Sequence, residues 1–134
     1  MAIVEAEIAV RRLLQTLSPT LPTAYEGISF VPPDGMYQRV QFVVNAPTDP
    51  TLGNYFYREN IEVQIFVVDK LDVGTSAALQ RAEAIRNLFH KGLSLEEGGF
   101  RIQILRTPQV SGVSVGNDRL VVPVLIPLIV EVYT

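Results

Sequence analysis

From residue 55 to residue 68 the chain alternates between apolar and polar side chains, a pattern typical of a strand with one buried face. The apolar side of this alternation consists of Tyr55, Tyr57, Ile61, Val63, Ile65 and Val67. The polar side consists of Arg58, Asn60, Glu62 and Gln64. After a short loop the period becomes helical, and the recurring apolar positions are Ala78, Ala82, Ile85 and Phe89. A long half-buried strand is therefore predicted to lead into an amphipathic helix.

The ends of this helix are indicated by capping residues. Thr75 or Ser76 is expected to be its N-cap, because a side-chain oxygen there can accept a bond from a free backbone N–H. Gly92 is expected at the C′ position, where glycine tolerates a left-handed backbone. His90 and Lys91 are then predicted to lie in the last turn, where the helix dipole favours positive charge.

An N-terminal helix is predicted for residues 3–17, where apolar side chains recur at helical spacing until Ser18 precedes a proline. The stripe expected to face the core holds Ile3, Ala6, Val10, Leu13, Leu14 and Leu17. Val4 and Ile8 fall outside this stripe, at about 100° and about 140° from Ile3. Because they are four residues apart, they form a second apolar patch. This patch is expected to be buried against another subunit, unless it belongs to a wider core stripe or consists of single exposed apolar residues without a role.

Shorter alternating segments bounded by turn residues predict the remaining strands. They are expected at residues 28–31, 36–44, 100–105, 110–115 and 120–133, with the last two forming a hairpin around the sequence GNDR. Residues 46–54 contain two prolines and a glycine, and residues 93–99 end in two glycines, so both segments are expected to be loops.

This order of elements predicts the fold class. One helix precedes three strands, and a second helix precedes three more. We expect an α+β fold in a single domain over residues 1–134, since 134 residues suit one domain. The sheet is predicted to be mostly antiparallel, with about four to six strands, and both helices are expected on one of its faces. The other face is expected to be free or covered by a neighbouring molecule.

The last predicted strand contains Pro123 and Pro127, which lie four residues apart. Residues of equal parity direct their backbone N–H groups to the same neighbouring strand, so both prolines remove donors from one flank only. The strand is therefore predicted to lie at an edge of the sheet or to be bulged there. The prolines either guard against aggregation or provide a functional bend.

Composition narrows the classes of function. Apolar residues make up 48% of the chain and charged residues 19%, which is below the ~25% usual in soluble domains. Some apolar surface is therefore expected to contact a partner. The net charge of −3 gives no basic footprint for nucleic acid, and the absence of cysteine excludes disulfides and thiolate metal sites. The start, MAIVEAEIAV, has two acidic residues and no basic n-region, so it is not expected to be a secretory signal. The longest apolar run, residues 120–130, is too short for a membrane helix.

Candidate catalytic residues are few. His90 is the single histidine, and the sequence places no orienting partner beside it. Asp69 and Asp72 do not have the spacing of a calcium loop. Glu96 and Glu97 adjoin two glycines and are expected in a turn. We therefore expect no catalytic, cofactor or metal site, and a minimal enzyme built on Asp69, Asp72 and His90 is the weakest alternative.

Two segments resemble the tail terminator-like proteins of long-tailed bacteriophages. They are FVPPDGMYQRVQFVV and YFYRENIEVQIFVVDKLDVGTSAALQRAEAIRNLF, and the resemblance extends from about residue 3 to about residue 132. In that family an N-terminal helix precedes a similar proline- and glycine-containing strand region. A loop, a strand rich in tyrosine and arginine, and a glycine-containing turn into an amphipathic helix follow.

The resemblance implies a structural protein of the virion, made in the host cytoplasm and placed at the head-proximal end of the tail. Such proteins form a ring, typically of six copies, that caps the tail tube, stops its polymerisation and provides the surface that joins the head. The implied partners are further copies of the chain, the tail tube protein and a head completion or connector protein. DNA is expected to pass through the lumen without specific binding, no membrane is involved, and no cofactor is implied.

Two surfaces are predicted to make these contacts. Val4 and Ile8 are expected at the interface between subunits. The loop is expected to touch the tube or a neighbouring subunit, unless it is merely exposed to solvent, through Pro47, Thr48, Asp49, Pro50, Thr51 and Leu52. The main alternative is another ring component of the head–tail junction, which would bind the portal side in place of the tube.

Overall fold

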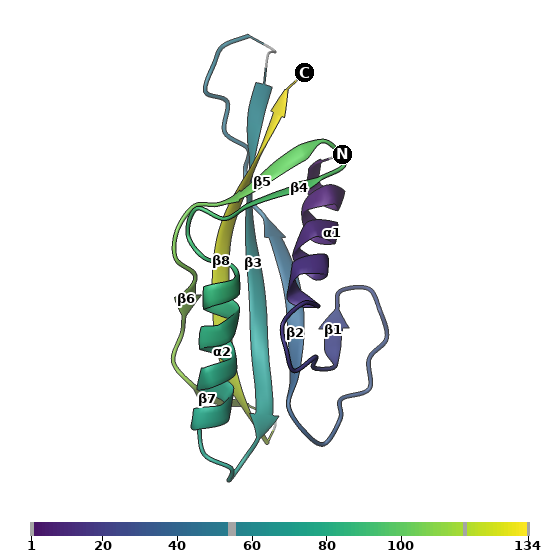
Figure 1. Cartoon of the computed structure of the whole chain (residues 1–134), viewed down its shortest axis with the longest axis vertical. Helices are drawn as coiled ribbons and strands as arrows, with labels where there is room; N and C mark the ends of the chain where they lie inside the picture. Colours follow the sequence, from purple (N-terminus) through teal and green to yellow (C-terminus); the bar gives the residue numbers. More distant parts are fainter. Residues whose placement is uncertain (1, 54–55, 117, 134) are drawn as a thin grey trace.

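The computed structural model describes residues 2–53, 56–116 and 118–133, which form two helices and one curled eight-stranded sheet (Figure 1). The elements are α1 (Ala2–Leu14), β1 (Thr23–Tyr25), β2 (Tyr37–Val44), β3 (Phe56–Lys70), α2 (Ser76–Leu88), β4 (Ser94–Glu97), β5 (Phe100–Ile104), β6 (Gln109–Val110), β7 (Ser114–Gly116) and β8 (Arg119–Tyr133). The strand order is β1-β2-β3-β8-β5-β4, and β6 and β7 also pair with β8. The α+β class is confirmed, but the sheet is larger than expected, and it is mixed because β1 runs parallel to β2.

The centre of the sheet is a continuous antiparallel ladder between β3 and β8, which pair from Phe56–Tyr133 at one end to Lys70–Arg119 at the other. The predicted alternation is confirmed along β3, since Ile61, Val63, Ile65 and Val67 are all buried. The predicted start of this strand, Tyr55, lies outside the described residues. The ladder runs along the longest dimension of the molecule (Figure 1).

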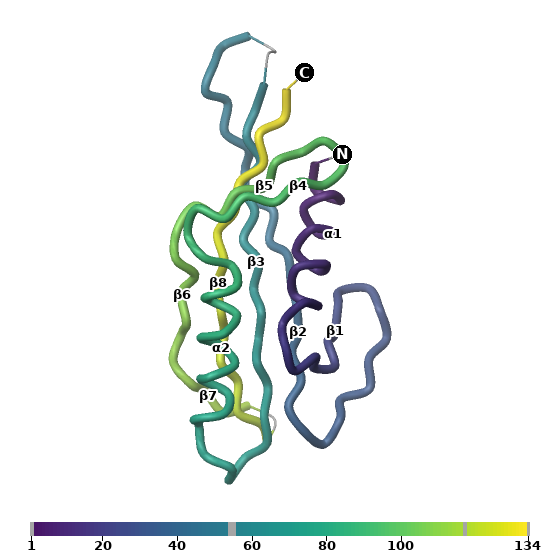
Figure 2. Tube along the Cα trace, viewed as in Figure 1, coloured from purple at the N-terminus to yellow at the C-terminus, as the bar shows by residue number. Residues whose placement is uncertain are grey.

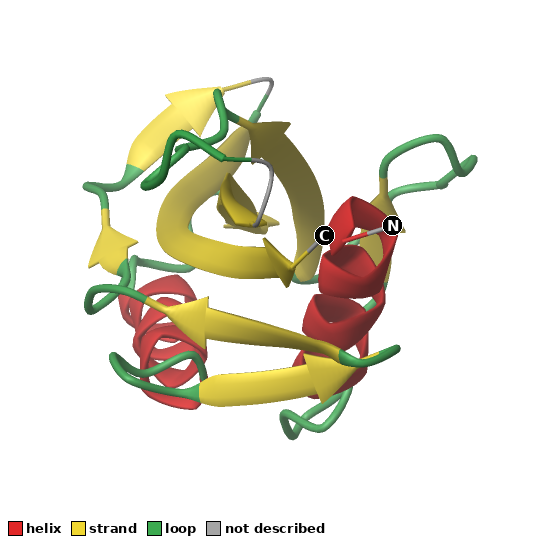
Figure 3. Cartoon of the chain, turned by 90° about the horizontal axis from the view of Figure 1, so that it is seen from above, coloured by secondary structure: helices red, strands yellow, loops and turns green. Residues whose placement is uncertain are grey.

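Both helices contribute to one apolar core on the same face of β3 and β8. Ala78, Ala82 and Ile85 of α2 are fully buried, and so is Phe89 at its C-cap, as the helical period predicted. In α1 the buried residues are Ala2, Ala6, Ala9, Val10 and Leu14. These side chains join the buried residues of the central strands in a single cluster. Seen from above, the sheet curls strongly behind the two helices, and β4 and β5 run across in front of them (Figure 3).

The predicted helix ends need correction. The first helix stops at Leu14 and not at residue 17, because the backbone tightens there and Leu17 N–H donates to the carbonyl of Leu14. Thr75 is the N-cap of α2, although its side chain makes no capping hydrogen bond. The other end was predicted wrongly, since Phe89 is the C-cap, and His90, Lys91 and Gly92 follow the helix. Gly92 has φ 84° and donates its N–H to the carbonyl of Ile104, which turns the chain onto β5.

Two short strands lie where sequence patterns did not place them. Residues 28–31 were predicted as a strand, but they form an irregular loop in which Val31 is 89% exposed. On the flank of β2 that faces away from β3, the paired strand is β1, which precedes Gly27 with its φ of 76°. The expected loop 93–99 contains β4, which pairs with β5 around Gly98 and Gly99. Both glycines have positive φ, which is the backbone of a two-residue hairpin turn.

The prolines of β8 interrupt pairing on one flank, but the prediction of an edge or a bulge is wrong. Pro123 and Pro127 lie within the interior strand β8, whose register with β3 continues past both without an extra residue. On the other flank, β8 pairs in pieces with β7, β6 and β5. Pro127 falls between the β5 and β6 pairings, and Pro123 falls between those of β6 and β7. The prolines lack N–H donors at the two positions where this flank changes partner strand.

The first arm of the predicted C-terminal hairpin is divided between β6 and β7, and only β7 adjoins the turn. In that turn Asp118 has φ 62°, and Asn117 lies outside the described residues. The Cα trace shows that the loop between β2 and β3 projects at the same end of the molecule as the last residues of β8 and the start of α1 (Figure 2). The loop that joins β1 to β2 extends on the side of α1.

Candidate assembly surfaces

The loop between β2 and β3 extends beyond the body of the molecule (Figure 1). Its base is ordered by an isolated antiparallel bridge, in which Thr48 and Arg58 exchange two backbone hydrogen bonds of 2.8 Å. The amide of Asn60 adds hydrogen bonds to the carbonyl of Ala46 and to the hydroxyl of Thr48. Hydrogen bonds therefore hold the base of the loop in place, while the rest of the loop projects from the molecule.

The residues predicted to make contacts all lie on this projection. They are Pro47, Thr48, Asp49, Pro50, Thr51 and Leu52, and each is exposed. Leu52 is a large apolar side chain that is fully exposed. Asn54, the last residue of the predicted loop, lies outside the described residues. That the loop contacts a partner stays a prediction.

At the end of the β3–β8 ladder that adjoins the loop, a cluster of polar and aromatic side chains joins the two strands. Arg58 donates to Glu131 at 2.9 Å, and the hydroxyl of Tyr133 donates to the other oxygen of that carboxylate at 2.9 Å. The bonds from Arg58 and then Tyr133 lower the pKa of Glu131, and the bond to Glu131 raises the pKa of Tyr133. The ring of Tyr133 also stacks on Phe56, with centroids 5.3 Å apart.

The predicted second patch of α1 lies on the surface. Val4 is 50% exposed and Ile8 is 38% exposed, so neither belongs to a wider core stripe. Ile3 was predicted to face the core, but it is 37% exposed. The buried side of α1 near its start is occupied by the smaller Ala2 and Ala6.

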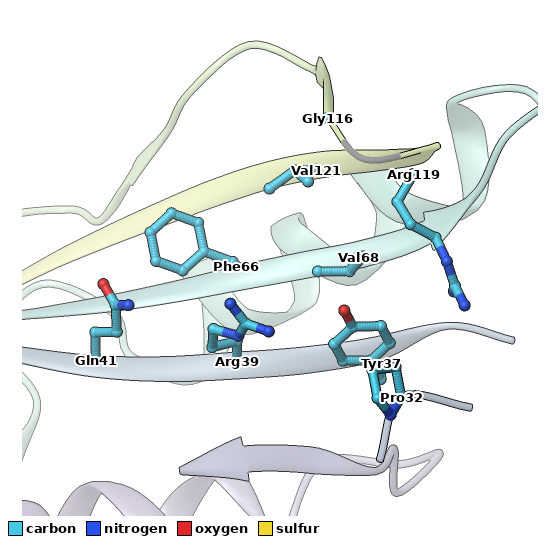
Figure 4. Close-up of a pocket in the computed structure, with 9 residues that line it drawn as sticks. All are labelled: Pro32, Tyr37, Arg39, Gln41, Phe66, Val68, Gly116, Arg119 and Val121. Carbon is cyan, nitrogen blue, oxygen red and sulfur yellow. The ribbon is translucent and has the colours of Figure 1, made fainter. Parts of the chain in front are cut away.

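A pocket of about 480 Å³ opens on the sheet face opposite the helices (Figure 4). It is lined by residues of β2, β3 and β8 together with Pro32 and Gly116. Arg39 and Gln41 stand on this face beside Phe66, as alternation requires, because Arg39 pairs with Phe66 in the ladder. The nine described lining residues include two arginines and no carboxylate.

The two arginines of this pocket differ in their surroundings. Arg119 donates to the carbonyls of Pro33 and Gly35, and its guanidinium lies 5.6 Å from the ring centre of Tyr37. It therefore holds the loop that forms one rim. Arg39 is exposed, and no described residue forms a hydrogen bond or ion pair with its guanidinium. Its charge is available to a partner.

The residues of the alternative minimal enzyme are not brought together. Asp69 is buried at the end of β3, where it accepts a bond from the N–H of Lys70, and Asp72 follows in the turn with φ 63°. His90 follows the opposite end of α2, and a helix of 13 residues spans about 20 Å. Its Nδ1 lies 3.1 Å from the carbonyl oxygen of Lys91.

The acidic pair Glu96 and Glu97 was expected in a turn but forms the end of β4, where it has a structural role. Glu97 forms an ion pair with Arg12 of α1, while Glu96 lies 3.7 Å from Arg101 across the hairpin. Within the described part of the chain, no group of three or more His, Cys, Asp or Glu side chains could hold a metal ion. No helix in that part has both the length and the apolar character needed to cross a membrane.

The fold matches that of a known protein structure. That solved chain superposes on this one with a TM-score of 0.75, covering 99% of this chain and 95% of its own length at 24% identity. No curated protein matches the sequence. The family model described as phage tail terminator protein matches residues 5–128. The chain therefore belongs to the phage tail terminator family, and its role is that of a structural component of the phage tail and virion.

The loop and the exposure of Val4 and Ile8 were predicted from the sequence, but the pocket was not. Arg39, Phe66 and Arg119 come from three strands whose neighbours are set by the tertiary fold. One signal was present in the segment YQRVQFVV, where alternation places Tyr37, Arg39 and Gln41 opposite the buried Val40.

Proposed function

We propose that copies of this chain form a ring that caps the head-proximal end of the tail tube. The ring stops tube polymerisation and provides the surface that the head completion or connector protein binds. Membership of the phage tail terminator family supports this role. So does the presence of two unlike exposed surfaces on one chain, the α1 patch (Ile3, Val4 and Ile8) and the projecting loop.

Two unlike surfaces are what a ring requires. A closed ring joins subunits through a heterologous interface, in which each copy offers one surface to the preceding neighbour and a different one to the next. In the proposed assembly Val4 and Ile8 pack against the adjacent subunit. The ring has six copies, and the net charge of −3 favours a lumen through which DNA passes without adhering.

The proposal is tested with purified protein and tail tubes that lack a cap. Light scattering over a concentration series measures self-association, with and without tubes. Electron microscopy then shows whether the protein sits as a ring at one end of each tube and whether tube growth stops. A strict monomer that ignores tube ends would overturn the proposal. Binding to the portal side alone would identify a different component of the head–tail junction.

A further inference from the structure

The pocket on the open sheet face and the projecting loop have complementary chemistry. The pocket offers the unpaired guanidinium of Arg39 beside the apolar surface of Phe66 and Val121. Residues 46–53 contain one acidic side chain, Asp49, and no basic one. Three positions further on they present Leu52, which is fully exposed.

We infer that the loop of one subunit inserts into the pocket of a second copy. In this contact Asp49 faces Arg39, and Leu52 packs against Phe66 and Val121. The inference rests on the proposed function and deepens it, because it identifies the loop's partner as the neighbouring subunit and not the tube.

The loop cannot fill the pocket of its own chain. Its base is bonded to Arg58, while Arg39 pairs with Phe66, which is 66 − 58 = 8 residues further along β3. Eight residues of strand span about 27 Å, and the loop projects beyond the start of β3 (Figure 1). The contact therefore joins different copies.

The loop and the pocket are different surfaces that lie toward opposite ends of the ladder. In the inferred assembly each copy gives its loop to one neighbour and receives the loop of another, which is a heterologous contact. Such contacts repeat from copy to copy and close into a ring when the rotation between neighbours allows it. The bonds at Thr48 and Asn60 order the loop base before docking, which lowers the entropy lost on association.

Reversal of the two charges tests the contact. Arg39→Asp and Asp49→Arg should each weaken self-association by about tenfold or more, because each places like charges together. The two changes in one chain should restore association. An equal mixture of the single variants should restore it too, because every contact is complementary when the two kinds of chain alternate. Arg106→Asp and Glu83→Arg change exposed charges elsewhere and should leave association unchanged. If the double variant is no better than either single variant, the inference is wrong.

Cross-linking gives a second readout that does not depend on charge. The chain has no cysteine, so Arg39→Cys and Asp49→Cys each introduce one reactive thiol. A short bis-maleimide should produce covalent dimers from the mixture well above the yield from either variant alone. Equal yields from Asp49→Cys alone would show that loops meet loops and would overturn the inference.

The tube assay separates this inference from the proposed function. Wild-type rings on tube ends together with a failed charge rescue would leave the proposed function standing and the inference refuted. Specific cross-linking by a protein that never caps tubes would support the loop-to-pocket contact and refute the proposed function. If Arg39→Asp abolishes capping but not self-association, the pocket receives a tube segment, and the inference is wrong.

Discussion

Arg81 of α2 donates a hydrogen bond from Nη1 to the backbone carbonyl of Pro19 over 2.7 Å. The same guanidinium reaches Oε1 of Gln38 on β2 at 3.3 Å and 3.4 Å. Arg81 is only 6% exposed, and its partners in these bonds are neutral, so desolvation lowers its pKa. One side chain thus ties α2, β2 and the connector that follows α1.

Removal of this side chain should destabilise the fold. Arg81→Ala deletes the bond to Pro19 and leaves Oε1 of Gln38 without this donor, so we expect a loss of about 2–4 kcal/mol of unfolding free energy. Urea denaturation measures it. Arg86→Ala removes a hydrogen bond to the carbonyl of Pro108 and should cost less. Equal losses would contradict the special role of Arg81.

Gly98 in the β4–β5 turn should not tolerate a side chain. Its φ is 58°, and a Cβ there would lie 2.8 Å from Cγ of Glu5 on α1. Gly98→Ala should therefore lower the unfolding free energy by about 1 kcal/mol or more. Gly35→Ala is the matched control, because a Cβ at Gly35 meets nothing within 4 Å. Thermal melts of the two variants should differ clearly, and identical melts would refute the expectation.

The α1 patch should matter for assembly and not for folding. Since Val4 and Ile8 are already exposed, the double variant Val4→Ser, Ile8→Gln should lose no more than about 1 kcal/mol of monomer stability. Ring assembly should fail. Val10→Ser on the same helix removes a fully buried side chain and should cost about 1.5–3 kcal/mol. Normal assembly by the double variant would remove this patch from the proposed interface.

The loop should likewise be dispensable for folding. Replacement of residues 47–52 by a short Gly-Ser link removes side chains that are exposed. The isolated bridge at Thr48 is lost as well, but no buried side chain is, so the melting temperature should change little. Tail completion should be abolished. Infectivity measures this in a phage that carries the variant, and normal infectivity would show that the loop makes no essential contact.

The cluster at Glu131 should make stability depend on pH in one direction. The hydrogen bonds from Arg58 and then Tyr133 hold the pKa of Glu131 below its ordinary value in the folded state, so the ionised carboxylate stabilises the fold above that ordinary value. This stabilisation is lost as the pH falls through the folded pKa. Glu131→Gln should therefore be less stable than wild type near neutral pH, and the difference should vanish in acid. Denaturant midpoints between about pH 3 and about pH 7 measure it, and a difference that persists in acid would contradict this assignment.

Local periodicity predicted the helices and strands whose buried face follows from the spacing of their own apolar residues. The alternation in β3 and the helical spacing of Ala78, Ala82 and Ile85 needed no knowledge of neighbours. The strand β1 is too short to show a period, and its position depends on its pairing with β2. The hairpin at Gly98 and Gly99 had a local signal, since paired glycines suit a two-residue turn, but the segment was interpreted as a loop.

The assembly surfaces also differ in whether local sequence predicts them. The exposure of Val4 and Ile8 follows from one helical wheel, although the same wheel placed Ile3 in the core, and the loop follows from its prolines. The pocket could not be predicted, because Arg39, Phe66 and Val121 become neighbours only when β2, β3 and β8 adopt their order in the sheet. The partner-changing positions at Pro123 and Pro127 depend on that order too.

The ladder between β3 and β8 has a mechanical consequence. Its two strands run antiparallel for 15 residues each, which is about 50 Å, and connect the end that carries the loop to the end that carries the pocket. A pulling force applied between these ends acts along the strands, so the hydrogen bonds are sheared together and do not open one after another. The molecule is therefore stiffest along the line in which its two ends would be pulled apart.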